Sequence, residues 1–281
     1  MLAPLSLVPV EFSLAAVLAW GTSDFLGGYI SKRVNAFLIA TIAHSGGLVL
    51  MTSVALLGGS PLPSRASILW ALAGGFSGGA ALAVFYRALS RGNMGLTATI
   101  SAVLGAAIPA VFGIVTEGLP GYARLAGFLL AGIGIWLISG SQGESRPQAL
   151  GLAVLAGLGF AGFFICMKQA GDGPAAWMAT FSRASALAVT AVILLFTRGF
   201  RRVGGRAVAF GVVAGFLDTS GTALFVRASQ TGRLDVAVVL TSLYPAVTVL
   251  LARAILKEHF TRWKAIGLVA GLAAVPLIAM Q

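Results

Sequence analysis

The sequence predicts an all-α membrane protein in which ten transmembrane helices form two inverted repeats of five helices around a central cavity. Three observations support this fold class. Of the 281 residues, 58% are hydrophobic and only 10% are charged, whereas soluble domains carry roughly 25% charged residues. Ten apolar runs each approach the length of a membrane span, which is about 20 residues. Segments that lie about 140 residues apart also share sequence, so we interpret the chain as one unit written twice.

The apolar runs follow one another with short connections, which leaves no room for a soluble domain. They are residues 11–31, 35–58, 67–89, 95–116, 121–140, 149–169, 175–197, 207–229, 234–256 and 262–280. We assign residues 1–140 to the first repeat and residues 141–281 to the second. No Lys or Arg precedes the first run, which therefore lacks the positive region of a signal peptide and is expected to remain a membrane span.

The internal repeat rests on matched short segments. Gly75-Phe76 corresponds to Gly215-Phe216, and Phe85-Tyr86 corresponds to Phe225-Val226. Because each unit has an odd number of spans, the second unit enters the membrane from the opposite side. Inverted repeats are typical of secondary transporters, whose substrate binds near the bilayer midplane between the repeats. Duplicated channels and scaffolds would show the same pattern, so both stay open as alternatives.

The composition disfavours several other classes of function. No phosphate-binding loop of the form G-x-x-x-x-G-K-[ST] occurs. Cys166 is the only cysteine, and the two histidines, His44 and His259, lie far apart in the sequence. We therefore expect no enzymatic activity, no cofactor and no metal site. The net charge of +11 fits loop ends that face anionic lipid better than a surface for nucleic acid.

Positive charge is distributed unequally between the two sides of the predicted topology. One side carries twelve Lys or Arg residues and the other carries five. The richer side includes Lys32 and Arg33, which directly follow the first span. Cytoplasmic loops of membrane proteins are enriched in these residues. The count therefore predicts that both chain termini lie outside the cytoplasm.

Two prolines fall inside predicted spans. Pro109 lies in the fourth span and Pro245 lies in the ninth. Each proline removes a backbone hydrogen bond and leaves a carbonyl group without its donor. Such carbonyl groups at membrane depth face protein or a water-filled cavity. We expect either a plain kink or a helix break beside the substrate site at each proline.

Small residues mark helix faces that pack closely. Gly74 and Gly78, and likewise Gly75 and Gly79, are four residues apart in the third span, a spacing that lets helix backbones approach each other. Similar faces occur in the fifth and tenth spans, at Gly127, Ala131, Gly134, Gly267 and Gly271. They suit packing against a neighbouring helix or a second protomer, so a monomer and a homodimer both stay open.

Charged residues inside the spans give the sharpest functional signal, because each costs roughly 2.5–3.5 kcal/mol at mid-membrane. Asp24 and His44 lie at similar depth in the first two spans. Such a pair either exchanges protons near neutral pH, which would provide proton coupling, or only fixes helix packing. Arg183 and Asp218 are a second predicted pair. They either bind a zwitterion, with its carboxylate on Arg183 and its ammonium on Asp218, or form an internal salt bridge.

The remaining candidates for the cavity lining provide apolar surface and hydroxyl groups. The aromatic candidates are Trp20, Tyr86 and Tyr244, and the hydroxyl candidates are Thr97, Thr99, Ser101 and Thr241. Glu117 and Glu258 end the fourth and ninth apolar runs. We expect them only to cap helices and to anchor the span ends.

The segments around Trp20 and Pro245 resemble a known family. Trp20-Gly21-Thr22-Ser23-Asp24-Phe25 is similar to the Trp-Gly-Ser signature of EamA-type transporters in the drug/metabolite transporter superfamily. Tyr244-Pro245-Ala246-Val247, followed by Leu256-Lys257-Glu258, resembles the Ser-Pro-Val and Leu-Gly-Glu segments of that family. The resemblance implies a ten-helix carrier whose cavity lies between helices one to four and six to nine, with helices five and ten outside. It also implies termini inside the cell, which conflicts with the charge count.

The resemblance bears on site residues and on function. Arg183 and His44 match the position where the family often carries an arginine in the second helix of each repeat. Members similar to this chain export amino acids, related metabolites or drugs. We therefore expect an inner-membrane secondary active or facilitative transporter that exports amino acids or similar small amphipathic metabolites by alternating access. Drugs, cationic compounds and other metabolites are alternative substrates. The expected partners are a small-molecule substrate and the lipid bilayer, with no nucleic acid.

Overall fold

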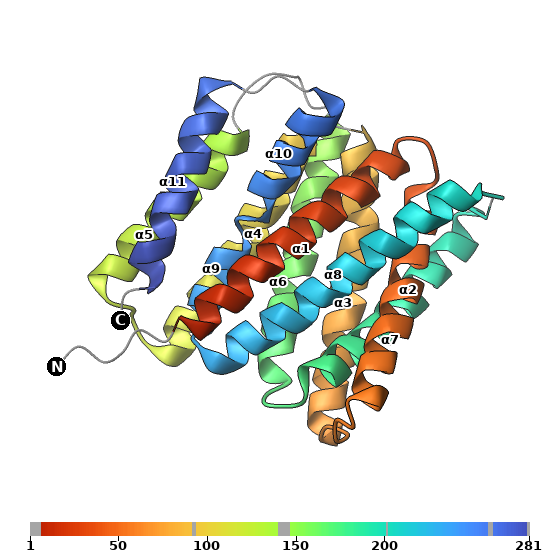
Figure 1. Cartoon of the computed structure of the whole chain (residues 1–281), viewed down its shortest axis with the longest axis horizontal. Helices are drawn as coiled ribbons and strands as arrows, with labels where there is room; N and C mark the ends of the chain where they lie inside the picture. Colours follow the sequence, from red (N-terminus) through yellow and green to blue (C-terminus); the bar gives the residue numbers. More distant parts are fainter. Residues whose placement is uncertain (1–6, 92–93, 140–146, 201, 258–260, 280–281) are drawn as a thin grey trace.

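The computed structural model of the chain is a bundle of helices packed side by side (Figure 1). It describes residues 7–91, 94–139, 147–200, 202–257 and 261–279, and all regular secondary structure in these ranges is helical. The helices are α1 (Val8–Ser31), α2 (Ala36–Leu57), α3 (Arg65–Arg91), α4 (Met94–Glu117), α5 (Tyr122–Ser139), α6 (Pro147–Gln169), α7 (Ala175–Phe196), α8 (Gly205–Thr231), α9 (Leu234–Thr241), α10 (Tyr244–Leu256) and α11 (Arg262–Ala279). The prediction of an all-α protein is confirmed.

The helices are long and apolar, as a membrane protein requires. Seven segments of the described chain are long and apolar enough to cross a membrane, and Tyr122–Leu137 within α5 is a shorter apolar helix. One of the seven, Leu234–Leu256, combines α9 and α10. With these two helices taken as one span, the helical segments correspond to the ten spans predicted from the sequence.

The span that contains Pro245 is interrupted. α9 ends at Thr241, and Pro245 lies in the first turn of α10. Proline suits this position because the backbone N–H that it lacks would have no acceptor within the helix there. The interruption therefore falls at Ser242 and Leu243, just before the proline.

The other proline does not interrupt its helix. α4 runs from Met94 to Glu117 as one helix with Pro109 inside it, so of the two alternatives at Pro109 the helix break is not observed and the plain kink stays open. Transmembrane helices tolerate proline where neighbouring helices hold the chain in place. α4 has such neighbours, because it packs against α6 on one side and contacts α9 and α10.

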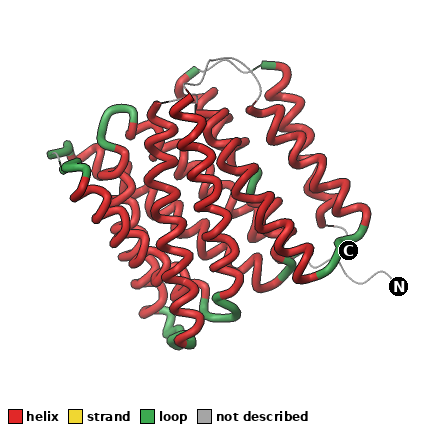
Figure 2. The backbone as a smooth tube through the Cα atoms, turned by 180° about the vertical axis from the view of Figure 1, so that it is seen from behind, coloured by secondary structure: helices red, strands yellow, loops and turns green. Residues whose placement is uncertain are grey.

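The helices divide into a central bundle and an outlying pair. α5 and α11 pack mainly on each other and lie at one edge of the molecule (Figures 1 and 2). Within the central bundle, α1 packs along α8 and α3 packs along α6. α2 contacts α7 and α8, and α3 also contacts α7. The outlying pair agrees with the expectation that the fifth and tenth spans lie outside the cavity.

Two glycines allow the closest approaches between helices of the central bundle. Gly75 of α3 lies against the backbone of Ser182 in α7, and Gly215 of α8 lies against the backbone of Ala43 in α2. A Cβ atom at either glycine would overlap a carbonyl oxygen of the partner helix. Because small residues let backbones come together in a membrane, these two contacts fix how closely α3 and α8 approach their neighbours.

The small faces of α5 and α11 meet within one chain. Gly134 of α5 lies against the backbone of Gly267 and Gly271 in α11, and Gly127 lies against Ile278. The small residues singled out in the fifth and tenth spans therefore serve an intramolecular contact. They give no support to a homodimer.

A group of ion pairs joins helix ends at one face of the bundle. Glu117, the last residue of α4, lies 3.0 Å from Lys168 of α6. Its carboxylate also accepts a hydrogen bond of 3.2 Å from the backbone N–H of Leu234, the first residue of α9. Arg233 donates to the carboxylate of Asp235 at 2.8 Å, and these hydrogen bonds raise the pKa of the Arg233 guanidinium. Glu117 thus caps α9 and anchors the end of α4.

Candidate functional site

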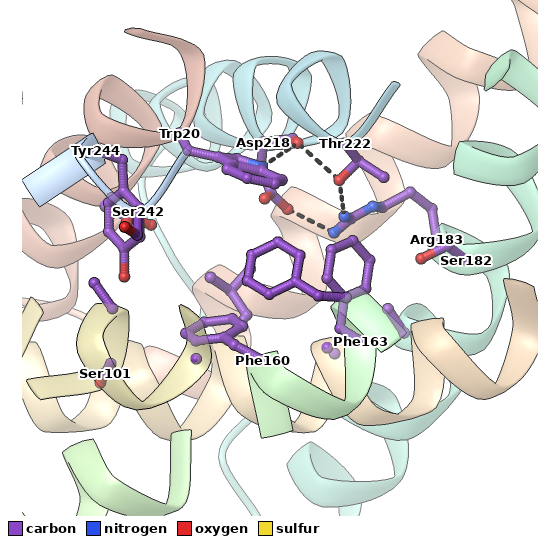
Figure 3. A pocket seen from close by; sticks show the side chains of 18 residues that line it. Trp20, Ser101, Phe160, Phe163, Ser182, Arg183, Asp218, Thr222, Ser242 and Tyr244 are labelled. Carbon is purple, nitrogen blue, oxygen red and sulfur yellow. Dashed lines mark hydrogen bonds and ion pairs between the residues drawn. The ribbon is translucent and has the colours of Figure 1, made fainter. Parts of the chain in front are cut away.

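A cavity lies inside the central bundle (Figure 3). Its lining comes from α1, α3, α4, α6, α7, α8 and the interrupted α9–α10 span, so both halves of the chain contribute. Most of the lining is apolar or aromatic. Three charged side chains lie among these residues: Asp24, Arg183 and Asp218.

Arg183 is held by side chains from two other helices. Its Nη1 donates to Oδ2 of Asp218 at 2.5 Å, and its Nη2 donates to the hydroxyl of Thr222 at 2.6 Å (Figure 3). Asp218 and Thr222 are one turn apart on α8, so both side chains lie on one face of that helix and both accept hydrogen bonds from the Arg183 guanidinium. Nη1 also lies 3.1 Å from Nδ1 of His44 on α2. The predicted pair of Arg183 and Asp218 is therefore formed as an internal salt bridge.

The contact with Arg183 assigns a role to His44. A guanidinium has only donors, so Nδ1 of His44 must accept the hydrogen bond. A ring that accepts at Nδ1 is neutral and carries its proton on Nε2. His44 is fully buried and is absent from the cavity lining. His44 therefore contacts Arg183 from outside the cavity lining.

Asp24 lines the cavity without a partner of its own. The residue is buried, with 7% of its surface exposed. Among the described residues, no hydrogen bond or ion pair is found for its side chain. The expected pair with His44 is not formed, because His44 faces Arg183 instead. Similar depth on neighbouring helices does not fix the direction in which a side chain points, which is why the pairing was wrong. The charges of Asp24 and Asp218 lie close enough to interact.

Aromatic rings form one wall of the cavity. The Trp20 ring lies 5.8 Å from the Phe164 ring and 6.5 Å from the Phe163 ring, measured between centroids. Phe225, behind this wall, lies 4.8 Å from Phe164. The Nε1–H group of Trp20 donates to the carbonyl oxygen of Asp218 at 3.0 Å. This bond and the ring contacts hold the indole of α1 in place beside the charged group of α8.

The other predicted residues divide between the cavity and the surrounding core. Tyr244 and Ser101 line the cavity, and the Tyr244 hydroxyl donates to the Ala98 carbonyl at 3.4 Å. Tyr86, Thr97 and Thr241 are fully buried and are absent from the lining. The structure thus places these three in the core around the cavity and not in its lining. The Thr99 side chain and Glu258 lie outside the described residues.

Several lining residues were not predicted from the sequence. They are Phe160, Phe163, Phe164, Ser182, Thr222 and Ser242. One signal was available for Thr222, since it follows Asp218 by one helical turn. The phenylalanines gave no such signal, because phenylalanine is equally suited to lipid-facing and buried positions of a membrane helix. In the described part of the chain, no three His, Cys, Asp or Glu side chains gather where they could hold a metal ion.

Comparisons with known proteins show a family match in the second half of the chain and a similar fold over nearly all of it. Residues 148–280 match the sequence model of the EamA-like transporter family. The protein is thus a multi-pass membrane transporter. The match lies in the second half of the chain, and the matched family is part of the drug/metabolite transporter superfamily.

The similarity to solved structures extends over nearly the whole chain. One crystal structure has a TM-score of 0.76 and 17% sequence identity, and the match covers 96% of this chain and 95% of that chain. At this level of identity the similarity establishes a shared fold and carries no information about substrate. A search of curated proteins finds no match.

Proposed function

We propose that this transporter is a secondary active or facilitative carrier that exports small amphipathic organic solutes across the inner membrane by alternating access. The observation that carries the proposal is the cavity between the two halves of the chain. It is lined by an aromatic wall, an unpaired carboxyl group at Asp24 and a fixed ion pair at Arg183 and Asp218. Charged groups at membrane depth are costly and usually mark a substrate pathway.

The packing of the helices supports the proposed inverted repeat. The repeat relates α1 to α6, α2 to α7 and α3 to α8, so the contact of α1 with α8 has its counterpart in the contact of α6 with α3. Likewise, the contact of Gly75 with Ser182 has its counterpart in the contact of Gly215 with Ala43. The family model matches only residues 148–280, which is about the length of one proposed repeat. A pair of inverted repeats can exchange conformations, which is the basis of alternating access.

Two substrate classes fit different groups in the cavity. An amino acid or a similar metabolite would place its ammonium group at Asp24 and its carboxylate near Arg183. A cationic compound would need Asp24 and the aromatic wall only. Asp218 is no longer a free site for an ammonium group, because Arg183 already neutralises it. Proton coupling stays a proposal that depends on Asp24, since His44 is engaged by Arg183.

Exchange in liposomes tests the proposed carrier. The purified protein is reconstituted, loaded with one unlabelled solute at a time and mixed with the labelled form outside. The panel contains amino acids, organic cations, sugars and organic anions, each measured with and without a pH gradient. Saturable counterflow of one class is expected of a carrier. High flux that never saturates and shows no counterflow would instead indicate a channel, and protein-free liposomes control for leakage.

A further inference from the structure

We infer that the cavity selects organic cations, such as a protonated amine joined to a flat apolar group, and that Asp24 is the residue that selects them. This inference rests on the carrier function proposed above and assigns its substrate class. It is drawn from three features of the cavity: the balance of charge in its lining, the bonds already made by Arg183 and the aromatic wall around Trp20.

The described part of the lining holds two acidic side chains and one basic side chain. Arg183 and Asp218 neutralise each other at 2.5 Å, and Asp24 is left as a carboxyl group without a counter-charge. A bound monocation would balance this carboxylate. With Asp24 ionised, a zwitterion would leave its charge unbalanced, and an anion would add a second negative charge. Because uncompensated charge is expensive inside a membrane protein, the lining favours the cation.

Arg183 is poorly placed to bind the carboxylate of an amino acid. Its two terminal nitrogens donate to Asp218, Thr222 and His44. Its remaining nitrogen, Nε, has no partner among the described residues but is sealed from open space. A substrate carboxylate would have to break the existing bonds to reach the guanidinium. Such an exchange would leave the buried Asp218 without its partner, which is costly.

The aromatic wall provides the second half of a cation site. The faces of aromatic rings carry partial negative charge and attract a cation, most strongly in tryptophan. Trp20, Phe160, Phe163, Phe164 and Tyr244 all line the same cavity as Asp24. Apolar parts of a substrate can pack against these rings while its charged group meets Asp24.

Three probes that share one phenyl group and differ in charge test the inference. They are trimethyl(2-phenylethyl)ammonium, phenylalanine and 2-phenylethanesulfonate, which are a cation, a zwitterion and an anion, respectively. All three keep a charged group near neutral pH and cross lipid slowly. Counterflow is measured in liposomes for the unaltered protein and for the variants Asp24→Asn, Asp24→Glu and Glu11→Gln. Glu11 is the matched control, because it is an exposed acidic residue on the same helix.

The expected result is saturable exchange of the cation in preference to the other two probes. Asp24→Asn should weaken this exchange by about 10- to 100-fold, as loss of a charged partner does, while Asp24→Glu and Glu11→Gln retain it. Retention in Asp24→Glu shows that a loss in Asp24→Asn reflects charge and not misfolding. Preferred exchange of phenylalanine or the sulfonate would overturn the inference and leave the carrier function standing. So would undiminished cation exchange by Asp24→Asn. Absence of counterflow for these probes and for the whole earlier panel would overturn the carrier function as well.

Discussion

Asp218 Oδ2 lies 2.5 Å from Arg183 Nη1 in a part of the bundle where both residues are more than nine-tenths buried. The salt bridge joins α8 to α7 beside the cavity. Burial of an ion pair has a large desolvation cost, so such a pair contributes little net stability, whereas removal of one partner is strongly destabilising. Removal of one partner should therefore lower stability much more than removal of both.

Arg183→Ala should abolish transport and lower stability by about 3–5 kcal/mol, because Asp218 is left buried without its partner. Thermal unfolding in detergent and counterflow in liposomes measure the two effects. The double variant Arg183→Leu with Asp218→Leu should recover most of the stability, since both charges are gone, but not the transport. Normal transport by well-folded Arg183→Ala protein would contradict the role of this pair in the cavity.

The glycine contacts predict where an added methyl group is not tolerated. Gly215→Ala and Gly75→Ala should each destabilise the protein by about 1–3 kcal/mol, the usual cost of overpacking, because the new Cβ meets a backbone carbonyl of the next helix. Gly132→Ala is the matched control, since no atom lies within 4 Å of its Cβ position. Differential scanning fluorimetry gives the shift in Tm. An equal shift for Gly132→Ala would show that the effect is not due to close packing.

Glu117 combines an ion pair with a helix cap, and two variants separate these contributions. Glu117→Gln keeps an oxygen for the N–H of Leu234 and loses only the partly exposed ion pairs with Lys168 and Arg233, so it should cost about 1 kcal/mol. Glu117→Ala loses the cap as well and should cost about 0.5–2 kcal/mol more. Unfolding measured at low and high salt distinguishes them, because only the ion-pair contribution is screened. Equal stability of both variants would rule out the capping role.

Trp20 offers a test of the aromatic wall. Trp20→Leu should weaken binding of the phenyl-bearing cation more than Trp20→Phe, because only the latter keeps a ring that attracts a cation. The expected difference is about 0.5–2 kcal/mol, which equilibrium binding of labelled cation to the detergent-solubilised protein can resolve. Both variants lose the hydrogen bond to the Asp218 carbonyl, so this loss cancels in the comparison. Equal affinities of the two variants would argue against a contribution of the ring.

The sequence predicted the helical fold and most of the charged site because these depend on local properties. Length and hydropathy define spans, and the cost of charge in a membrane marks Asp24, Arg183 and Asp218 as candidates for a functional site. The partner of each group depends on helix rotation, which local sequence does not encode. Arg183 and Asp218 were paired correctly, whereas His44 was paired with Asp24 and in fact contacts Arg183. The same limit explains Tyr86 and Thr241, which are buried but do not line the cavity.

The interruption between α9 and α10 distinguishes the two halves of the chain. In a carrier built from two identical inverted repeats, the inward-open and outward-open states would have equal energy, because exchange of the repeat conformations converts one state into the other. Here the second half has a divided helix at Ser242 and Leu243, whereas its counterpart α4 is continuous. The free energy needed to bend the divided helix differs from the free energy needed to bend the continuous one. For the alternating access proposed above, this difference predicts two open states of unequal energy, so that the empty protein would favour one of them.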